Sequence, residues 1–248
     1  ISSQKISVGP PFFNKLILPF LIPFMLAMAI GPKLKWIKSD IEDKIYLISF
    51  FVISLILSVL IIRNLDINFL YNTILITAAF YLFFITLRDF FHRKYRNLSQ
   101  ITAHFSFSIL ILSILFNNIF SSEVITNLKI NETYQAQNLK INFESIEQEN
   151  KQNFKAIKGK FIVEDQSGLI EVMQPELRIY NQPNIVTSEA DIKTNIFTDK
   201  FMTMNYVQNQ DYFNIRYQVK PFMIWIWIST ILLCLSGCLS LIRKKYEN

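Results

Sequence analysis

The chain contains only two histidines, and one of them, His104, lies in the stretch QITAHFSFSIL, just inside a long apolar run. An imidazole is costly in hydrocarbon unless it hydrogen-bonds, lines a polar cavity or binds a ligand. A neutral imidazole at this position could bind haem iron, join a proton relay or hydrogen-bond a neighbouring helix. The residue pattern alone leaves these three alternatives open.

The other side chains with chemical potential are less specific. His92 lies in the basic segment RDFFHRKYRN, which is typical of a solvated loop. If the chain is helical between the two histidines, they are about 18 Å apart, too far to bind opposite faces of one haem. A bis-histidine site would therefore need its second ligand from another chain or segment. Cys234 and Cys238 are four residues apart on a predicted helix, where small sulfur side chains usually serve packing.

The apolar residues that surround these groups are arranged in blocks rather than in amphipathic patterns, and hydrophobic residues make up 51% of the chain. Most blocks reach the roughly 18–20 residues that a helix needs to cross a membrane. The sequence therefore predicts five transmembrane helices, with the fourth short unless Leu98 and Asn117 extend it. The predicted spans are Phe12–Ile30, Ile45–Ile62, Phe69–Leu87, Ile101–Phe116 and Phe222–Ile242.

Basic residues predict the orientation of these helices, because lysine and arginine are enriched in cytoplasmic segments. The segments after the first and third helices and the C-terminus are rich in lysine and arginine, whereas the segments on the other side hold only Lys5, Lys15 and Arg63. We therefore expect the N-terminus outside and the C-terminus inside. The net charge of +6 follows from this asymmetry and is not a nucleic-acid-binding signature.

The segment between the last two helices has a different character. It alternates polar and apolar residues in LKINFESIE and KGKFIVED, and LIEVM and FNIRYQV are rich in β-branched and aromatic residues. It contains no cysteine, so no disulfide stabilises it. We expect a small antiparallel sandwich or partly open barrel outside the membrane. The predicted strands include Leu139–Gln148, Lys158–Asp165 and Tyr212–Val219.

These patterns predict a polytopic α-helical membrane protein of about five transmembrane helices, with a small β-rich external domain between the last two. We expect a four-helix membrane region at residues 1–118, the external domain at 119–220, and the final helix with a basic cytoplasmic tail at 221–248. The lipid membrane is the expected environment, and no nucleic-acid partner is expected.

Several segments of the chain resemble segments of the CcmF-type cytochrome c haem lyases, and they occur in the same order as in that family. The first is SVGPPFFNKLILPFLIPFMLAMAIGP, and TAHFS is similar to the LAH-x-G helix of that family. PELRIY, SEADI and KPFMIWIW follow, so the resemblance covers nearly all of the chain and corresponds to the C-terminal half of the lyase. Two departures are Ser106 in place of the usual glycine and Ser236-Gly237 in place of a glycine pair.

The resemblance implies a part in attaching haem to apocytochrome c outside the membrane. It identifies His104 as one of two axial ligands to the iron of a resident haem b, and it identifies no catalytic residue in this chain. It also implies an N-terminal half carrying a tryptophan-rich segment, a haem-delivering chaperone and apocytochrome c as partners. That half is not in this sequence, so the chain alone should not complete haem ligation. The chain is expected to be a fragment or a split-gene product.

The expected location is the bacterial inner membrane, with the mitochondrial inner membrane as an alternative. Two other classes of function remain open: a transporter permease with an external domain, and an assembly scaffold without a cofactor. The sequence does not identify the electron donor, the cytochrome that is matured or the role of the external domain.

Overall fold

The computed structural model describes residues 10–34, 44–65, 67–91, 98–136, 139–165, 168–207 and 210–247. The chain forms two compact units, one of residues 1–115 and 225–248 and the other of residues 116–224. The first unit is helical, and the second is built of β-strands together with the adjoining ends of two helices.

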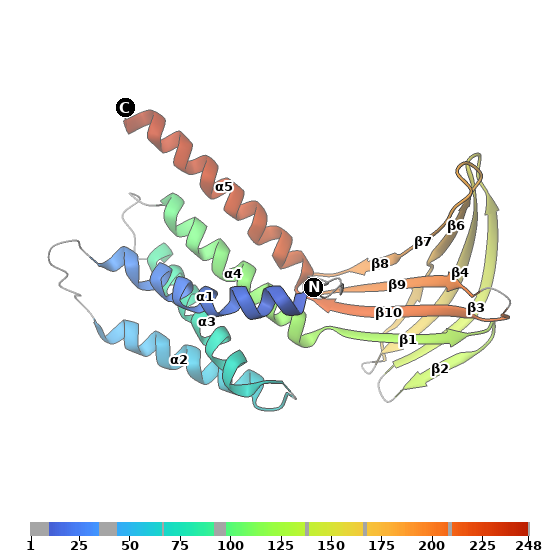
Figure 1. Cartoon of the computed structure of the whole chain (residues 1–248), viewed down its shortest axis with the longest axis horizontal. Helices are drawn as coiled ribbons and strands as arrows, with labels where there is room; N and C mark the ends of the chain where they lie inside the picture. Colours follow the sequence, from blue (N-terminus) through green and yellow to red (C-terminus); the bar gives the residue numbers. More distant parts are fainter. Residues whose placement is uncertain are drawn as a thin grey trace, which may run out of the picture. The chain divides into compact units, whose positions relative to one another are not determined.

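Within the described residues, five α-helices coincide with the five predicted apolar segments to within a few residues (Figure 1). They are α1 (Pro10–Ile30), α2 (Lys44–Ile62), α3 (Phe69–Phe91), α4 (Leu98–Phe120) and α5 (Met223–Glu247), and a single 3₁₀ turn, η1 (Gly31–Lys33), follows α1. By length and composition, α2, α3, α4 and the Met223–Ile242 part of α5 could cross a membrane. The apolar stretch found in α1 by the same measure, Pro19–Lys33, is shorter.

Helix α3 packs against both α1 and α2. Its apolar residues Leu75, Ile76, Leu82 and Ile85 are almost completely buried. In contrast, much of α2 is exposed: Ile48, Phe51 and Ile56 are examples. A helix that exposes large apolar side chains around much of its circumference is suited to lipid rather than water.

The second unit contains ten strands within the described residues, paired antiparallel throughout. Their bounds are β1 (Ser122–Leu128), β2 (Thr133–Ala136), β3 (Leu139–Asn150), β4 (Phe154–Asp165), β5 (Ile170–Met173), β6 (Glu176–Tyr180), β7 (Val186–Glu189), β8 (Asp191–Thr194), β9 (Thr198–Tyr206) and β10 (Phe213–Pro221). The strands predicted at 139–148 and 158–165 are confirmed as parts of β3 and β4, and the strand predicted at 212–219 is confirmed as β10, which begins one residue later.

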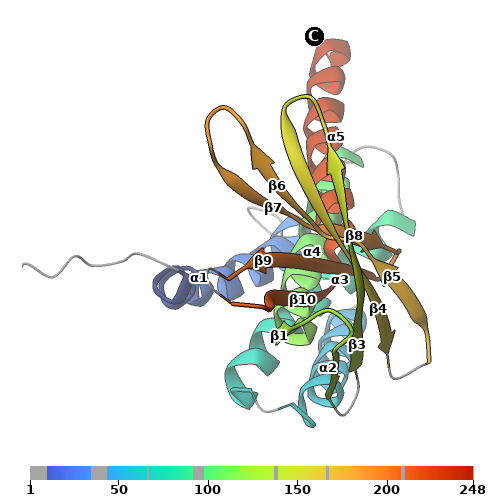
Figure 2. The same cartoon turned by 90° about the vertical axis from the view of Figure 1, so that its right-hand side faces the viewer.

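The strands form two sheets. One has the order β1-β10-β9-β8, and the other has the order β2-β3-β4-β6-β7, with β5 also pairing with β4. β6 and β7 form a hairpin, which is seen best in Figure 2. The prediction of a small antiparallel β-domain, a sandwich or a partly open barrel, is therefore confirmed, and its strands are divided between two sheets.

The core between the sheets is apolar and comes from both of them. Phe143 and Phe161 stack with ring centroids 4.3 Å apart, and both are fully buried. Gly159 on β4 leaves room for this packing, because a Cβ there would lie 2.6 Å from the ring of Phe161 and 2.8 Å from Sδ of Met204. The residues of this core are Leu128, Ile141, Phe143, Phe161, Val163, Met173, Leu177, Met202, Met204, Ile215 and Tyr217.

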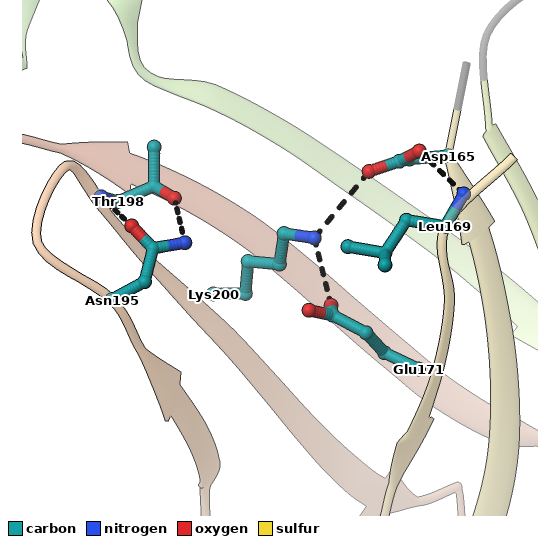
Figure 3. A network of polar contacts seen from close by, with 6 residues as sticks. All are labelled: Asp165, Leu169, Glu171, Asn195, Thr198 and Lys200. Carbon is teal, nitrogen blue, oxygen red and sulfur yellow. Dashed lines mark hydrogen bonds and ion pairs between the residues drawn. The ribbon is translucent and has the colours of Figure 1, made fainter. Parts of the chain in front are cut away.

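One charged side chain joins the two sheets at an end of this core. Lys200 on β9 donates a hydrogen bond to Oε2 of Glu171 on β5 at 2.7 Å, and its Nζ lies 3.5 Å from Oδ2 of Asp165 at the end of β4 (Figure 3). Its side chain is only 11% exposed. A nearly buried ammonium group needs such carboxylate partners, since an unpaired charge there would be strongly destabilising.

Candidate functional site

His104 lies on the inward face of α4. Ile101 and Ser108, three residues before it and four residues after it, share its side of the helix, and both are buried. The imidazole itself is half-buried. The side chain therefore faces residues of α1, η1 and α3 rather than the outside of the helical unit.

Aromatic contacts hold α4 in this rotation. The ring of Phe105, the residue after His104, stacks on Phe83 of α3 with a centroid distance of 5.4 Å and on Phe90 at 6.4 Å. On the other side, Phe107 makes an edge contact with Phe24 of α1 at 5.8 Å. Because these rings contact two different helices, rotation of α4 would break one set of contacts or the other.

A small polar pocket of about 170 Å³ lies beside the imidazole. An ion pair forms part of the pocket lining: Nζ of Lys33, in η1, lies 2.7 and 2.8 Å from the two carboxylate oxygens of Asp89 on α3. The two side chains are 15% and 21% exposed, so the pair is partly shielded from solvent. The remaining lining residues are Met28, Pro32, Thr86, Gln100, Ile101 and His104.

Another basic side chain and a tyrosine lie next to this ion pair, where α1 and α3 end and α2 begins. The ring of Tyr46 lies 3.7 Å from the guanidinium carbon of Arg88 and 5.7 Å from Nζ of Lys33. Cations at such distances are attracted by the negative face of the ring. The tyrosine thus helps hold two basic side chains close to each other and to the pocket.

His104 could supply one imidazole ligand at this pocket, but the pocket is too small to enclose a whole porphyrin. Within the described residues, the imidazole of His104 has no hydrogen-bond partner, so its nitrogens are available to a ligand. Pockets that enclose organic cofactors have volumes of roughly 300–1,000 Å³, whereas this one measures about 170 Å³. The donor chemistry therefore fits one axial bond to haem iron, and the remaining walls of such a site would have to come from elsewhere.

The sequence predicts His104 as a candidate ligand but does not predict its neighbours in the pocket. Asp89 and Lys33 are distant in the chain, and the positions of the two charges at the ends of apolar segments were the available signal. His92 lies outside the described residues. Cys234 and Cys238 are free and exposed on α5. The described residues contain no group of three or more histidine, cysteine or acidic side chains that could hold a metal ion by themselves.

Residues 119–221 match a family model described as the CcmF C-terminal β-sandwich. This range coincides with the two-sheet unit described above.

The whole chain is also similar to curated proteins of cytochrome c maturation. It is 25% identical over 262 residues to the cytochrome c-type biogenesis protein CcmF of Pseudomonas fluorescens, covering 100% of this chain and 40% of the relative. It is 24% identical over 254 residues to CcmF of Escherichia coli (strain K12), covering 98% of this chain and 39% of the relative. The chain thus spans about 40% of the length of the curated relatives it matches.

A solved structure named cytochrome c haem lyase CcmF has the same fold over 92% of this chain and 40% of its own, with a TM-score of 0.70 and 19% identity. This likeness concerns the fold. Together with the match of the sandwich and the full-length similarity to curated relatives, it confirms the resemblance seen in the sequence: the chain corresponds to the C-terminal part of the CcmF-type cytochrome c biogenesis proteins.

Proposed function

We propose that this chain is the C-terminal part of a cytochrome c haem lyase and that His104 is one axial ligand of a haem b resident among its helices. The observation that carries the proposal is the inward-facing imidazole of α4, beside a polar pocket and without a hydrogen-bond partner among the described residues. A histidine in an apolar helix is stabilised by a ligand more readily than by lipid.

The residues around His104 would orient the imidazole. Phe83 and Phe105 fix the rotation of α4, so the ring cannot turn toward lipid without losing aromatic contacts. The pair formed by Lys33 and Asp89 neutralises both charges beside the site. When bound, a haem b supplies reversible one-electron chemistry, whose potential depends on ligand identity and burial.

The rest of the lyase would supply what this chain lacks. We propose that an N-terminal part with a tryptophan-rich segment contributes the second axial ligand and the external haem site, and that a haem-delivering chaperone and apocytochrome c bind the assembled complex. The assembled complex, rather than this chain alone, would catalyse haem attachment.

We further propose a multi-pass location in the bacterial inner membrane, with residues 119–220 outside, between the four-helix region at 1–118 and the final helix at 221–248. The ion pair of Lys33 and Asp89 lies at helix ends, not in the middle of a span, so it does not favour the transporter alternative.

The test is replacement of His104 in the chain co-expressed with an N-terminal lyase part. His104→Ala should insert normally, since alanine is favourable in a helix, but should lose the haem b absorbance and cytochrome c maturation. Added imidazole should restore part of both by occupying the vacated coordination position. Two controls, Gln100→Ala in the same pocket and His92→Ala, should keep the spectrum. Wild-type haem content in His104→Ala would refute the ligand assignment.

A further inference from the structure

The turn between β8 and β9 lies at the end of its sheet where the chain enters and leaves the apolar helices. β1 starts at Ser122, directly after α4 ends, and β10 stops at Pro221, directly before α5 begins. In the antiparallel register, Thr198 at the start of β9 is opposite Pro221. The turn of residues 195–197 is therefore level with both helix ends.

Direct contacts within this unit attach the turn to those helix ends. The backbone N–H of Phe222 donates a hydrogen bond to the carbonyl of Phe197 at 2.7 Å, and Phe222 has a left-handed backbone with φ of 61°. Its ring lies 5.4 Å from that of Phe116 in α4. Nδ2 of Asn117 donates to the carbonyl of Pro221 at 2.7 Å. These contacts join the end of α4, the start of α5 and the turn.

The turn is closed by side-chain hydrogen bonds and carries an apolar tip. Oδ1 of Asn195 accepts hydrogen bonds from the N–H groups of Phe197 and Thr198 at 2.8 and 2.7 Å, and its Nδ2 donates to Oγ1 of Thr198 at 2.9 Å. Figure 3 shows the two hydrogen bonds between Asn195 and Thr198. Turn tips in water usually carry glycine, asparagine, aspartate, proline or serine. Here the tip carries Ile196 and Phe197, which are 63% and 62% exposed.

We propose that this turn inserts Ile196 and Phe197 into the outer face of the lipid bilayer, so that the sandwich is held against the membrane surface. The proposal rests on the membrane placement of α4 and α5 proposed above and not on haem binding. Lipid is the partner that the position favours, because the tip is level with the points where two apolar helices would enter the hydrocarbon. The side-chain hydrogen bonds of Asn195 satisfy backbone N–H groups that would otherwise be unpaired near the lipid.

Spin labelling of the full chain in liposomes tests the insertion. In a Cys234→Ser, Cys238→Ser background, Phe197→Cys and Ile196→Cys would be labelled separately with a nitroxide and reconstituted in phosphatidylcholine and phosphatidylglycerol vesicles. Power-saturation measurements compare the accessibility of each label to oxygen, which concentrates in lipid, and to a water-soluble nickel chelate. The ratio of oxygen to nickel accessibility should be several-fold higher at the tip than at an aqueous site.

The sheet offers matched controls. Tyr206 and Ile130 are also exposed and apolar, at 57% and 45%. Tyr206 is at the other end of β9, about 26 Å along the strand from Thr198, and Ile130 follows β1 at that same end. Labels at both positions should be aqueous, and a label at Leu235 in α5 should report lipid.

The outcomes are distinct. The insertion is supported if the labels at 197 and 196 report lipid by their high ratio of oxygen to nickel accessibility, while the labels at 206 and 130 report water. If the label at 197 reports water while the label at 235 reports lipid, the insertion is overturned but the membrane placement of the helices is still supported. Water at 235 overturns the placement and the insertion together. Exclusion of both reagents at 197 shows contact with protein in place of lipid and also overturns the insertion. Each outcome is independent of the haem content of His104 variants.

Discussion

Two polar side chains, Lys200 and His104, lie at the edges of apolar cores and differ in their polar partners. Lys200 is paired with the carboxylates of Glu171 and Asp165, so its charge is compensated inside the sandwich. The imidazole of His104 lies beside an ion pair whose members already satisfy each other. Pairing of this kind offsets the desolvation cost of burying each charge, whereas the histidine keeps its capacity to bind a ligand.

A titration prediction belongs to this residue scale. Burial raises the pKa of the Tyr217 hydroxyl above its ordinary value of 10.0, and the negative charges of Glu171 and Asp165 raise the pKa further. An unfolded chain would lose this proton near pH 10, whereas the folded sandwich retains it. This group therefore leaves stability unchanged below pH 10 and lowers it as the pH rises above 10.

Tyr217→Phe should consequently reduce the alkaline loss of stability of an excised sandwich, residues 119–221, in urea unfolding at pH 8 to 11. The comparison is Tyr206→Phe, which removes the same hydroxyl from a side chain that is 57% exposed. Equal alkaline slopes in wild type and Tyr217→Phe would contradict the prediction.

At the scale of elements, α4 and β4 are each placed by one tightly packed feature. The aromatic contacts of Phe105 and Phe107 set the rotation of α4 and thereby direct His104 inward. On β4, Gly159 lets the backbone approach the rings of the sandwich core, and its N–H donates to the carbonyl of Pro175 at 3.0 Å. In both elements a close contact between neighbours decides the position of the side chains around it.

Gly159→Val should destabilise the sandwich by about 1–3 kcal/mol, the usual cost of overpacking a filled core. The added methyl groups would collide with Phe161 and Met204. Gly168→Ala is a useful comparison, because a Cβ there meets open space and only its φ of +74° is unfavourable. Its cost should be about 1–2 kcal/mol. Chemical denaturation of the excised domain measures both. A neutral Gly159→Val would show that the core can shift to accept the side chain.

At the scale of the whole molecule, each compact unit has its own buried residues: the helical unit buries α3, and the strands bury the sandwich core. The two environments need opposite exteriors. Exposed Phe51 and Ile56 on α2 suit lipid, whereas surface ion pairs such as Lys160 with Glu144, at 2.7 Å, suit water. This division is consistent with a membrane region and a separate water-exposed domain.

The distribution of basic residues predicts which side of the membrane each part occupies. In a Cys234→Ser, Cys238→Ser background, a cysteine at Asn150 should react with a membrane-impermeant maleimide added outside, and cysteines at Lys94 and Lys245 should react only from inside. Lys94 lies outside the described residues. Labelling of position 94 from outside would refute the five-span arrangement.

Length, hydropathy and alternation are local properties of a segment, so the sequence predicts the five apolar helices and the three strands that correspond to β3, β4 and β10. The predicted span 101–116 extends to Leu98–Phe120, since polar residues complete the helix at both ends. The span predicted to end at Leu87 continues to Phe91, and the pairing of Asp89 with Lys33 accounts for a charge inside that helix.

Which elements become neighbours depends on contacts between residues that are far apart in the chain, and these follow from the folded structure. Alternation predicts that β10 is a strand but not that it lies between β1 and β9, because period-two patterning carries no information about the partner strand. The same holds for the candidate site: His104 was identifiable from its cost in an apolar segment, whereas Lys33 and Asp89 are 56 residues apart and meet only through the packing of α1 on α3. Long-range packing, absent from any local pattern, places the ion pair beside the imidazole.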